Sequence, residues 1–311
     1  MNPALDEGHV RLELGGAASG ARIRHVAACP GISPPDCAEN DIPIHFHEQG
    51  MVLSRVRFSS ELGLGKGFQV GLELPLDFKV STIRYELVDG SSYQPPYSGI
   101  HHRNETLVGL GDGRLRLRYV ARIGDLVTLG VGAGATLPFG RTEEDPFLLA
   151  KEGDEHQHFQ FGTGTIIPVA STEILIRKDR FGLQLWSSAQ FSMYTNGKDF
   201  KPGSSVTWGI APQVKIHPRV DLLAIFDGLH QAKDIWSGEQ APSSGKHRLN
   251  AGAMIGVTVH RGVWVYVQGS VPVWQRSLSI VQDDQILEPF TGSMGVSWAL
   301  DTPIWGKKKA E

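Results

Sequence analysis

Residues 126–137, Leu-Val-Thr-Leu-Gly-Val-Gly-Ala-Gly-Ala-Thr-Leu, alternate between two kinds of side chain over their whole length. Valine, leucine and alanine fill the odd positions, while glycine and threonine fill most of the even ones. Successive side chains of an extended strand point to opposite faces, so this stretch predicts a strand with one apolar face and one small or polar face. A phosphate-binding glycine loop would need a helix directly after it, and the following residues have no helical period. We therefore interpret these glycines as small residues on the inner face of a β-barrel.

The same period of two residues recurs along most of the chain. About 9 to 11 alternating residues cross a membrane as a tilted β-strand. The first such segment is short, with Val10, Leu12 and Leu14 alternating with Arg11 and Glu13. The expected strands are 8–15, 51–62, 68–80, 113–122, 126–137, 159–176, 181–194, 204–216, 220–230, 249–260, 263–276 and 289–300.

The connections between these strands alternate between tight turns and long loops. The tight turns are 63–67, 123–125, 177–180, 217–219 and 260–262. The long loops are 89–112, 138–157, 195–203, 231–248 and 277–288. Outer-membrane barrels have short periplasmic turns and long extracellular loops. The sequence therefore predicts an all-β fold, an antiparallel up-and-down transmembrane β-barrel of about 12 strands with both termini in the periplasm.

This barrel accounts for the whole chain, 1–311, as one domain. Residues 16–47 are expected to form an extracellular loop, and residues 301–311 a periplasmic tail. The first 30 residues lack the basic, apolar and small-residue order of a signal peptide. Since an outer-membrane protein must be exported, we expect its export signal to lie outside the sequence given. A soluble lipocalin-like barrel or sandwich is the alternative that the missing leader leaves open.

Composition excludes other classes of protein. The chain has 30 lysine and arginine residues against 33 aspartate and glutamate residues, a net charge of −3. It therefore has no basic excess with which to bind nucleic acid. No apolar run reaches the ~18 residues of a transmembrane helix. The expected partners are outer-membrane lipid and a small solute, and the oligomeric state is open.

Three motifs resemble a known family. They are Gly-Asp-Gly-Arg-Leu-Arg-Leu-Arg-Tyr at 111–119, Thr-Leu-Pro-Phe-Gly at 136–140 and His-Phe-Gln-Phe-Gly-Thr-Gly-Thr at 158–165. Together with the tight turn between the first two, they resemble the meta-pathway phenol-degradation family of outer-membrane transporters. The resemblance covers roughly residues 105–175, and the rest of the chain shares only the rhythm of strands. It implies an envelope protein linked to the uptake of hydrophobic or aromatic small molecules, and it brings no catalytic residue with it.

The leading hypothesis is a barrel without enzymatic activity that passes or binds small molecules through a narrow lumen. An outer-membrane lipid hydrolase or deacylase is the alternative, because barrels of this size can hold a serine and histidine site. The sequence has no Gly-X-Ser-X-Gly motif to support that alternative.

The polar faces of three expected strands carry many charges. The expected lumen-lining residues are Arg55, Arg57, Glu61, Glu73, Asp77, Lys79, Arg114, Arg116, Arg118 and Arg122. One interpretation is that the arginines pair with the carboxylates and fill a narrow interior, because unpaired buried charge is costly. The other is that a cationic lining selects anionic or carboxylated solutes. Twelve strands predict a lumen between the filled interior of an eight-stranded barrel and the wide channel of a porin.

The histidines gather on the side with the long loops. Three close pairs are candidates for a divalent transition-metal site at the mouth: His45, His47, His101, His102, His156 and His158. Neutral imidazoles suit zinc, copper or nickel. The alternative is that these histidines are ordinary loop residues and that the protein has no cofactor.

Cys29 and Cys37 are the only two cysteines. An exported protein meets an oxidising compartment, so we expect a disulfide that closes a small extracellular loop. Free or metal-bound thiols are the alternatives.

Overall fold

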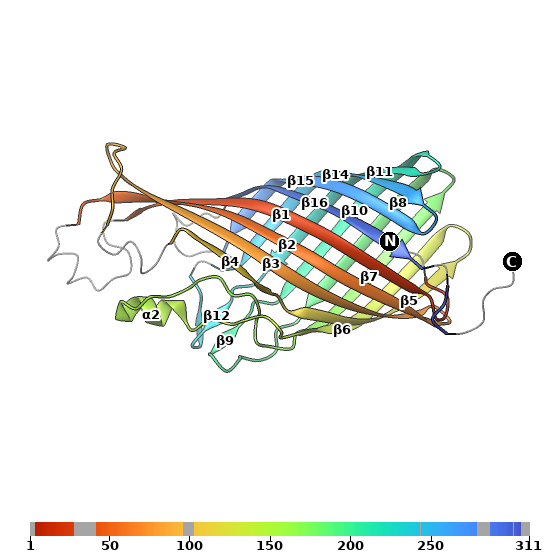
Figure 1. Ribbon diagram of the computed structural model, residues 1–311, viewed down its shortest axis with the longest axis horizontal. Helices are drawn as coiled ribbons and strands as arrows, with labels where there is room; N and C mark the ends of the chain where they lie inside the picture. Colours follow the sequence, from red (N-terminus) through yellow and green to blue (C-terminus); the bar gives the residue numbers. More distant parts are fainter. Residues whose placement is uncertain are drawn as a thin grey trace.

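The computed structural model describes residues 4–27, 42–95, 103–242, 244–278, 287–300 and 302–305. Thirteen strands of this part of the chain form one antiparallel sheet (Figure 1). The sheet is closed because β2 pairs with β1 on one side and with β3 on the other. The chain therefore forms a transmembrane-type β-barrel, and the predicted all-β class is confirmed.

The strands of the barrel are β1 (Val10–Ala27), β2 (His45–Gly65), β3 (Phe68–Leu87), β4 (Glu105–Leu110), β5 (Gly113–Ile123), β6 (Val127–Leu137), β7 (Pro168–Lys178), β8 (Phe181–Gln190), β10 (Ser205–His217), β11 (Val220–Gln231), β14 (Lys246–His260), β15 (Val263–Ser277) and β16 (Leu287–Ala299). A second, three-stranded sheet is formed by β9 (Phe200–Lys201), β12 (Ile235–Trp236) and β13 (Glu239–Gln240). The described helix is α2 (Pro146–Glu152).

Strands β4 and β5 share one position in the barrel. Both pair with β3, β4 along residues 76–81 and β5 along residues 68–73. Gly111 and Asp112 interrupt the strand between them. With β4 and β5 counted together, the described sheet has the 12 strand positions that the sequence predicts. Among the described strands β6 pairs with β5 and not with β4, so β4 is the free edge of the sheet.

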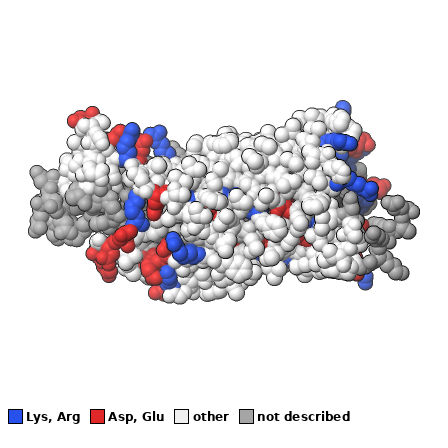
Figure 2. Space-filling view, viewed as in Figure 1, with Lys and Arg blue, Asp and Glu red and all other residues white. Residues whose placement is uncertain are grey.

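Alternation gives the wall an apolar outside. Val56 and Phe58 of β2 and Leu115 and Leu117 of β5 are large apolar side chains that are all exposed. A surface of such residues would be costly in water and suits the lipid that surrounds a membrane barrel. Figure 2 shows charged side chains gathered mainly toward the two ends of the molecule, with few between them. No helix in the described ranges has the length and apolar character needed to cross a membrane.

The expected pattern of connections is also present. Tight turns join β2 to β3, β5 to β6, β7 to β8, β10 to β11 and β14 to β15. These turns lie at the same end of the barrel as the start of β1 and the end of β16 (Figure 1). The amide of Leu300 donates a hydrogen bond to the carbonyl oxygen of Val10, which places these two strand ends side by side.

Several expected boundaries are wrong, and the expected loop 89–112 contains strand β4. The predicted strand 159–176 begins only at Pro168, because the amides of Phe161 and Gly162 donate to the carbonyl oxygen of Arg141 and not to a neighbouring strand. The expected extracellular loop 16–47 is strand at both ends, since β1 and β2 stay paired from Val10↔Leu62 to Ala27↔His45. Strands β1, β2 and β3, with 18, 21 and 20 residues, are therefore much longer than the sequence pattern indicated.

Candidate functional site

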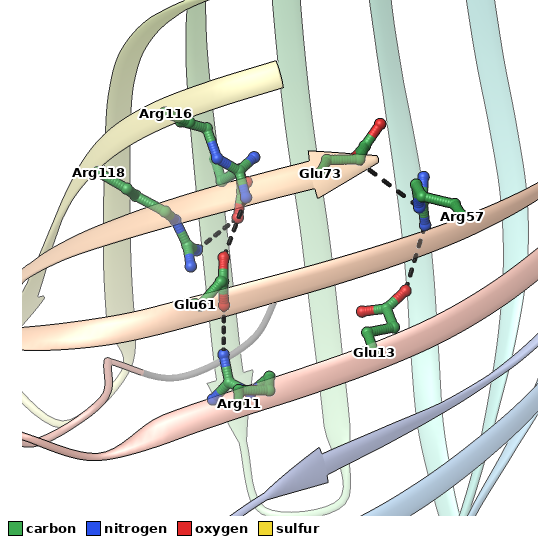
Figure 3. A network of polar contacts seen from close by, with 8 residues as sticks. Arg11, Glu13, Arg57, Glu61, Glu73, Arg116 and Arg118 are labelled. Atoms are coloured by element: carbon green, nitrogen blue, oxygen red, sulfur yellow. Dashed lines mark hydrogen bonds and ion pairs between the residues drawn. The ribbon is translucent and has the colours of Figure 1, made fainter. Parts of the chain in front are cut away.

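An ion-pair network crosses the inner face of the wall from β1 to β5 (Figure 3). The carboxylate of Glu61 on β2 accepts a hydrogen bond from Arg11 on β1 at 2.8 Å and another from Arg116 on β5 at 3.0 Å. Arg11 and Glu61 expose only 6% and 12% of their side chains. Buried charges are costly unless opposite charges offset them, so these three side chains hold one another in place.

Two more groups of ion pairs continue this network along the wall. Arg57 on β2 lies 3.2 Å from Glu13 on β1 and 3.8 Å from Glu73 on β3, as Figure 3 shows. Arg55 donates two hydrogen bonds to the two carboxylate oxygens of Asp77, at 2.6 and 2.8 Å. The paired fork of a guanidinium with a carboxylate fixes both orientation and distance. These contacts agree with the first interpretation of the charged face, in which arginines pair with neighbouring carboxylates.

Glycines of β6 make room for the next pair. Arg118 donates to Glu173 of β7 at 2.6 Å and is almost fully buried. A Cβ atom on Gly130 would be 3.3 Å from the Arg118 guanidinium, and one on Gly132 would be 2.6 Å from the Ser171 hydroxyl oxygen. The glycine-rich stretch is therefore the small inner face that the alternation indicated.

A cavity of about 230 Å³ lies between these ion pairs. Four arginines and three glutamates contribute to its lining: Arg11, Arg57, Arg114, Arg116, Glu13, Glu61 and Glu73. Ser59 on β2 and Gly71 on β3 complete much of the remaining wall. The lining residues carry one more positive than negative charge, so the cavity is polar and mildly cationic.

The remaining predicted lining residues have other surroundings. Lys79 on β3 meets a loop and not a strand, as described below, and Arg122 is exposed near the β5–β6 turn. Arg114 lines the cavity beside Glu73, yet its Nε atom is buried without a hydrogen-bond partner. Apart from Lys79 and Arg122, the predicted lumen-lining residues therefore lie in the ion pairs or in the cavity wall.

The loop between β6 and β7, residues 138–167 and named the inward loop here, turns into the barrel. Its Phe161 packs so closely on Gly109 of β4 that a Cβ atom there would be 2.8 Å from the ring. Lys79, on the inner side of β3, donates a hydrogen bond to the carbonyl oxygen of Gln160. The same ammonium group lies 4.8 Å from the centre of the Phe161 ring, in the range of a cation–π contact. The inward loop therefore packs against the inner side of β3 and β4.

One carboxylate anchors the inward loop to the wall. Asp112, between β4 and β5, accepts hydrogen bonds from the amide and hydroxyl of Thr163 at 2.7 and 2.8 Å. Its other oxygen accepts from the amide of Gly140 at 3.1 Å. A Cβ atom on Gly162 would be 2.3 Å from the same carboxylate, so only glycine allows this close approach. The break between β4 and β5 thus serves as the attachment point of the loop.

Helix α2 braces the outer part of the inward loop. Asp145 caps the helix by accepting from the amide of Phe147 at 2.9 Å, and it also accepts from the Ser237 hydroxyl at 2.7 Å. Phe200 and Trp236 of the small sheet pack with ring centres 4.5 Å apart, and Phe147 packs against this cluster. The helix and the small sheet therefore form one support at the extracellular end.

The predicted histidine ligands form separate pairs. The Nε2 atoms of His45 and His47 are 3.0 Å apart. The rings of His156 and His158 are centred 5.1 Å apart in an edge-to-face arrangement. Within the described ranges no group of three or more histidine, cysteine, aspartate or glutamate residues is placed to hold a metal ion. The expected convergence of these pairs on a shared site is therefore not seen there.

Four other predicted site residues, His101, His102, Cys29 and Cys37, lie outside the described residues. The disulfide and the third histidine pair stay predictions.

Sequence reasoning missed several contributors to the site. Arg11 and Glu13 were recognised only as the polar phase of the first strand, and Glu173 was not singled out. Their alternation with apolar residues was the signal that could have found them. Asp112 had no periodic signal, because it lies where the strand is interrupted.

Comparison with solved structures shows that this barrel shares its fold with an outer-membrane channel. Neither a protein-family model nor a curated protein sequence matches the chain. The TodX monoaromatic hydrocarbon channel, as a deltaS2S3 mutant, aligns with a TM-score of 0.47 and 10% identity over 96% of this chain and 91% of that one. The COG4313 outer membrane channel from Pseudomonas putida F1 aligns with a TM-score of 0.62 and 12% identity, covering 96% of this chain and 100% of that one. The chain therefore has the fold of an outer-membrane channel.

Proposed function

We propose that this chain is an outer-membrane channel without enzymatic activity that passes small, hydrophobic or aromatic molecules through a narrow charged lumen. The observation that carries the proposal is the pair of regions that line the inner face of the barrel, the ion-pair network around Glu61 and the inward loop. The apolar outer face supports a location in the outer membrane. Resemblance of residues 105–175 to the meta-pathway phenol-degradation transporters favours aromatic solutes.

The cavity between the ion pairs suits a single aromatic ring. An apolar cavity of about 150 Å³ is large enough to hold benzene. The cavity here has a volume of about 230 Å³ and a polar, mildly cationic lining. A phenol or benzoate would fill that volume and could accept hydrogen bonds from Arg114, whereas a plain hydrocarbon would leave the arginines without new partners. Aromatic solutes with an oxygen substituent are therefore the favoured class.

Planar bilayers containing the purified chain test this proposal. A gradient of potassium benzoate should give a reversal potential that reports measurable benzoate permeation. Glu73→Gln removes a negative charge from the cavity wall and should shift the reversal potential further toward benzoate. Glu239→Gln, on the exposed strand β13, is the matched control and should leave it unchanged. Channels that carry no benzoate current, or that respond equally to both substitutions, would contradict the proposal.

A further inference from the structure

Two histidines at the start of β2 form a buried pair that the proposed transport of solutes does not require. His45 and His47 are two residues apart on an extended strand, so their side chains leave the same face. Their exposed fractions are 0% and 1%. Tyr85 of β3, opposite His47 in register, packs edge-on against that ring with centres 4.8 Å apart. Tyr93 packs against His45 at 5.0 Å. The pair is therefore enclosed by aromatic rings at the extracellular end of the barrel.

The nitrogen atoms of the two rings converge. Their Nε2 atoms are 3.0 Å apart, whereas the ring centres are 4.9 Å apart. The difference means that the two rings point their Nε2 corners at each other and do not stack face to face. At this separation the two nitrogens cannot both carry a hydrogen, so they share either one hydrogen or one cation.

The backbone orients the first of these rings. The Nδ1 atom of His45 lies 2.7 Å from the carbonyl oxygen of Pro43. Because a carbonyl only accepts hydrogen bonds, Nδ1 of His45 carries the hydrogen and the neutral ring presents a lone pair at Nε2. Donation of the second ring nitrogen to a backbone carbonyl is the arrangement that orients metal-binding histidines.

The spacing also selects among metals. Two bonds of about 2.0–2.1 Å to nitrogens 3.0 Å apart would enclose an angle of about 95° at the metal. That angle is near the right angle of square-planar or tetragonal sites, which suit Cu²⁺ and Ni²⁺, and smaller than the tetrahedral angle of zinc. Cu²⁺ binds more tightly than the other divalent first-row ions to a given set of nitrogen ligands.

We propose that His45 and His47 together bind one Cu²⁺ ion through their Nε2 atoms. Among the described residues no third histidine, cysteine or carboxylate is grouped with them, so the proposal concerns these two ligands alone. The proposal does not depend on the transport function, because it rests on the geometry of the pair.

A histidine pair elsewhere in the barrel could compete for the ion. His230 and His247, opposite each other on β11 and β14, have their Nδ1 atoms 3.1 Å apart. His230 is exposed, and the rings are nearly parallel, with an angle of 25° between them. This exposed pair could bind Cu²⁺ by itself, and so could His156 and His158, whose rings are centred 5.1 Å apart. The test therefore begins from a His156→Ala/His158→Ala/His230→Ala/His247→Ala background that lacks both pairs.

The experiment is calorimetry and electron spin-echo spectroscopy with Cu²⁺ on the tag-free full chain in detergent micelles. The background protein should bind one Cu²⁺, and the echo modulation should report two imidazole ligands. Adding His45→Ala should weaken binding by about 100-fold or more, since even loss of an orienting partner costs 10- to 100-fold. Adding His217→Ala, at an exposed turn, should leave the affinity unchanged.

The two measurements keep the proposal falsifiable. Equal affinities of the His45→Ala and His217→Ala proteins would overturn it. If His45→Ala prevents folding, the echo modulation of Cu²⁺ bound to the background protein tests the proposal by itself. Two coordinated imidazoles then support the site, and one or none overturns it.

Discussion

Two regions line the inner face of the barrel, and they are built in different ways. The ion-pair network around Glu61 joins side chains of β1, β2 and β5, whose backbones are paired along their lengths. The inward loop is held mainly by side-chain contacts, with the wall at Asp112, Lys79 and Glu105 and with neighbouring loops at Asn196 and Lys198. Regions with few backbone hydrogen bonds open at lower free energy than paired strands. We therefore expect the network to hold its arrangement while the loop opens first.

The same contrast is visible in the wall itself. On one side β1, β2 and β3 are 18, 21 and 20 residues long, while β6, β7 and β8 have 11, 11 and 10. The inward loop begins and ends at the short strands β6 and β7, and it packs against the inner face of the long strand β3 and of β4. The long strands thus extend beyond the ends of the short ones and offer the loop an inner face to pack against.

The largest effect should follow from breaking the fixed network. Glu61→Gln removes the carboxylate that Arg11 and Arg116 share, and leaves the buried Arg11 guanidinium without this partner beside the partly exposed Arg116. Removing one partner of a buried ion pair costs about 3 to 5 kcal/mol in the free energy of unfolding. Urea unfolding in lipid vesicles measures this loss. The exposed Glu239→Gln should change stability by less than about 0.5 kcal/mol, and a similar value for Glu61→Gln would refute a stabilising network.

The next prediction separates the two faces of one strand. Phe58→Arg puts a charge on the lipid side of β2 and should cost about 2 to 4 kcal/mol of unfolding free energy. Its neighbour Ser59 lines the cavity, in register with Glu13 on β1 and Glu73 on β3. Ser59→Arg should therefore cost less than about 1 kcal/mol and should lower single-channel conductance by filling the cavity. Equal losses of stability for both substitutions would mean that the faces are assigned wrongly.

A smaller and local effect is expected where the loop is attached. Asp112→Ala removes the acceptor of three hydrogen bonds from Thr163 and Gly140. Hydrogen bonds to a charged group are worth about 1.5 to 3 kcal/mol, so we expect the loop to open about 30-fold more often. Tryptic cleavage at Lys151, on α2, would report that opening. Asp125→Ala, in the β5–β6 turn, is the control.

Global unfolding of the Asp112→Ala barrel should stay close to that of the parent, because the strands keep their pairing. A parallel loss of global stability would show that the loop and the barrel wall unfold together, and the contrast between the two regions would fail.

The sequence predicts the barrel well because its signal is local. A period of two residues decides which face each side chain joins, and a turn of two or three residues decides where a strand ends. The pairing of His45 with His47 was predictable for the same reason, since the residues are two apart on one strand.

The inward loop could not be predicted because its contacts are distant in the chain. Asp112 and Thr163 are 51 positions apart, and the alternation of 158–165 is compatible with a strand as well as with a loop. The partners of the arginines posed the same difficulty. Arg118 meets Glu173 only because β5, β6 and β7 are neighbours in the closed sheet.

The smallest effect concerns acid and the histidine that faces α2. Desolvation by the packed loop around it, together with the charge of His156, lowers the pKa of His158 from 6.5 to about 4. The ring packs edge-on to Phe147 with centres 6.0 Å apart, but the residue as a whole is exposed to solvent. This exposure screens the interaction and limits the size of the effect.

Because the pKa of His158 is lower in the folded chain, the opened loop binds more protons than the closed one between pH 6.5 and pH 4. The contribution of His158 to loop stability is therefore complete above pH 6.5 and is lost as the pH falls toward 4. Hydrogen exchange of the amides of residues 146–163, corrected for intrinsic rates, should show ~3-fold less protection at pH 5 than at pH 7.5. His158→Phe keeps an aromatic ring beside Phe147 but cannot take up a proton, so its loop should lose this pH dependence while the parent retains it. If both proteins respond to acid alike, His158 does not couple the loop to pH.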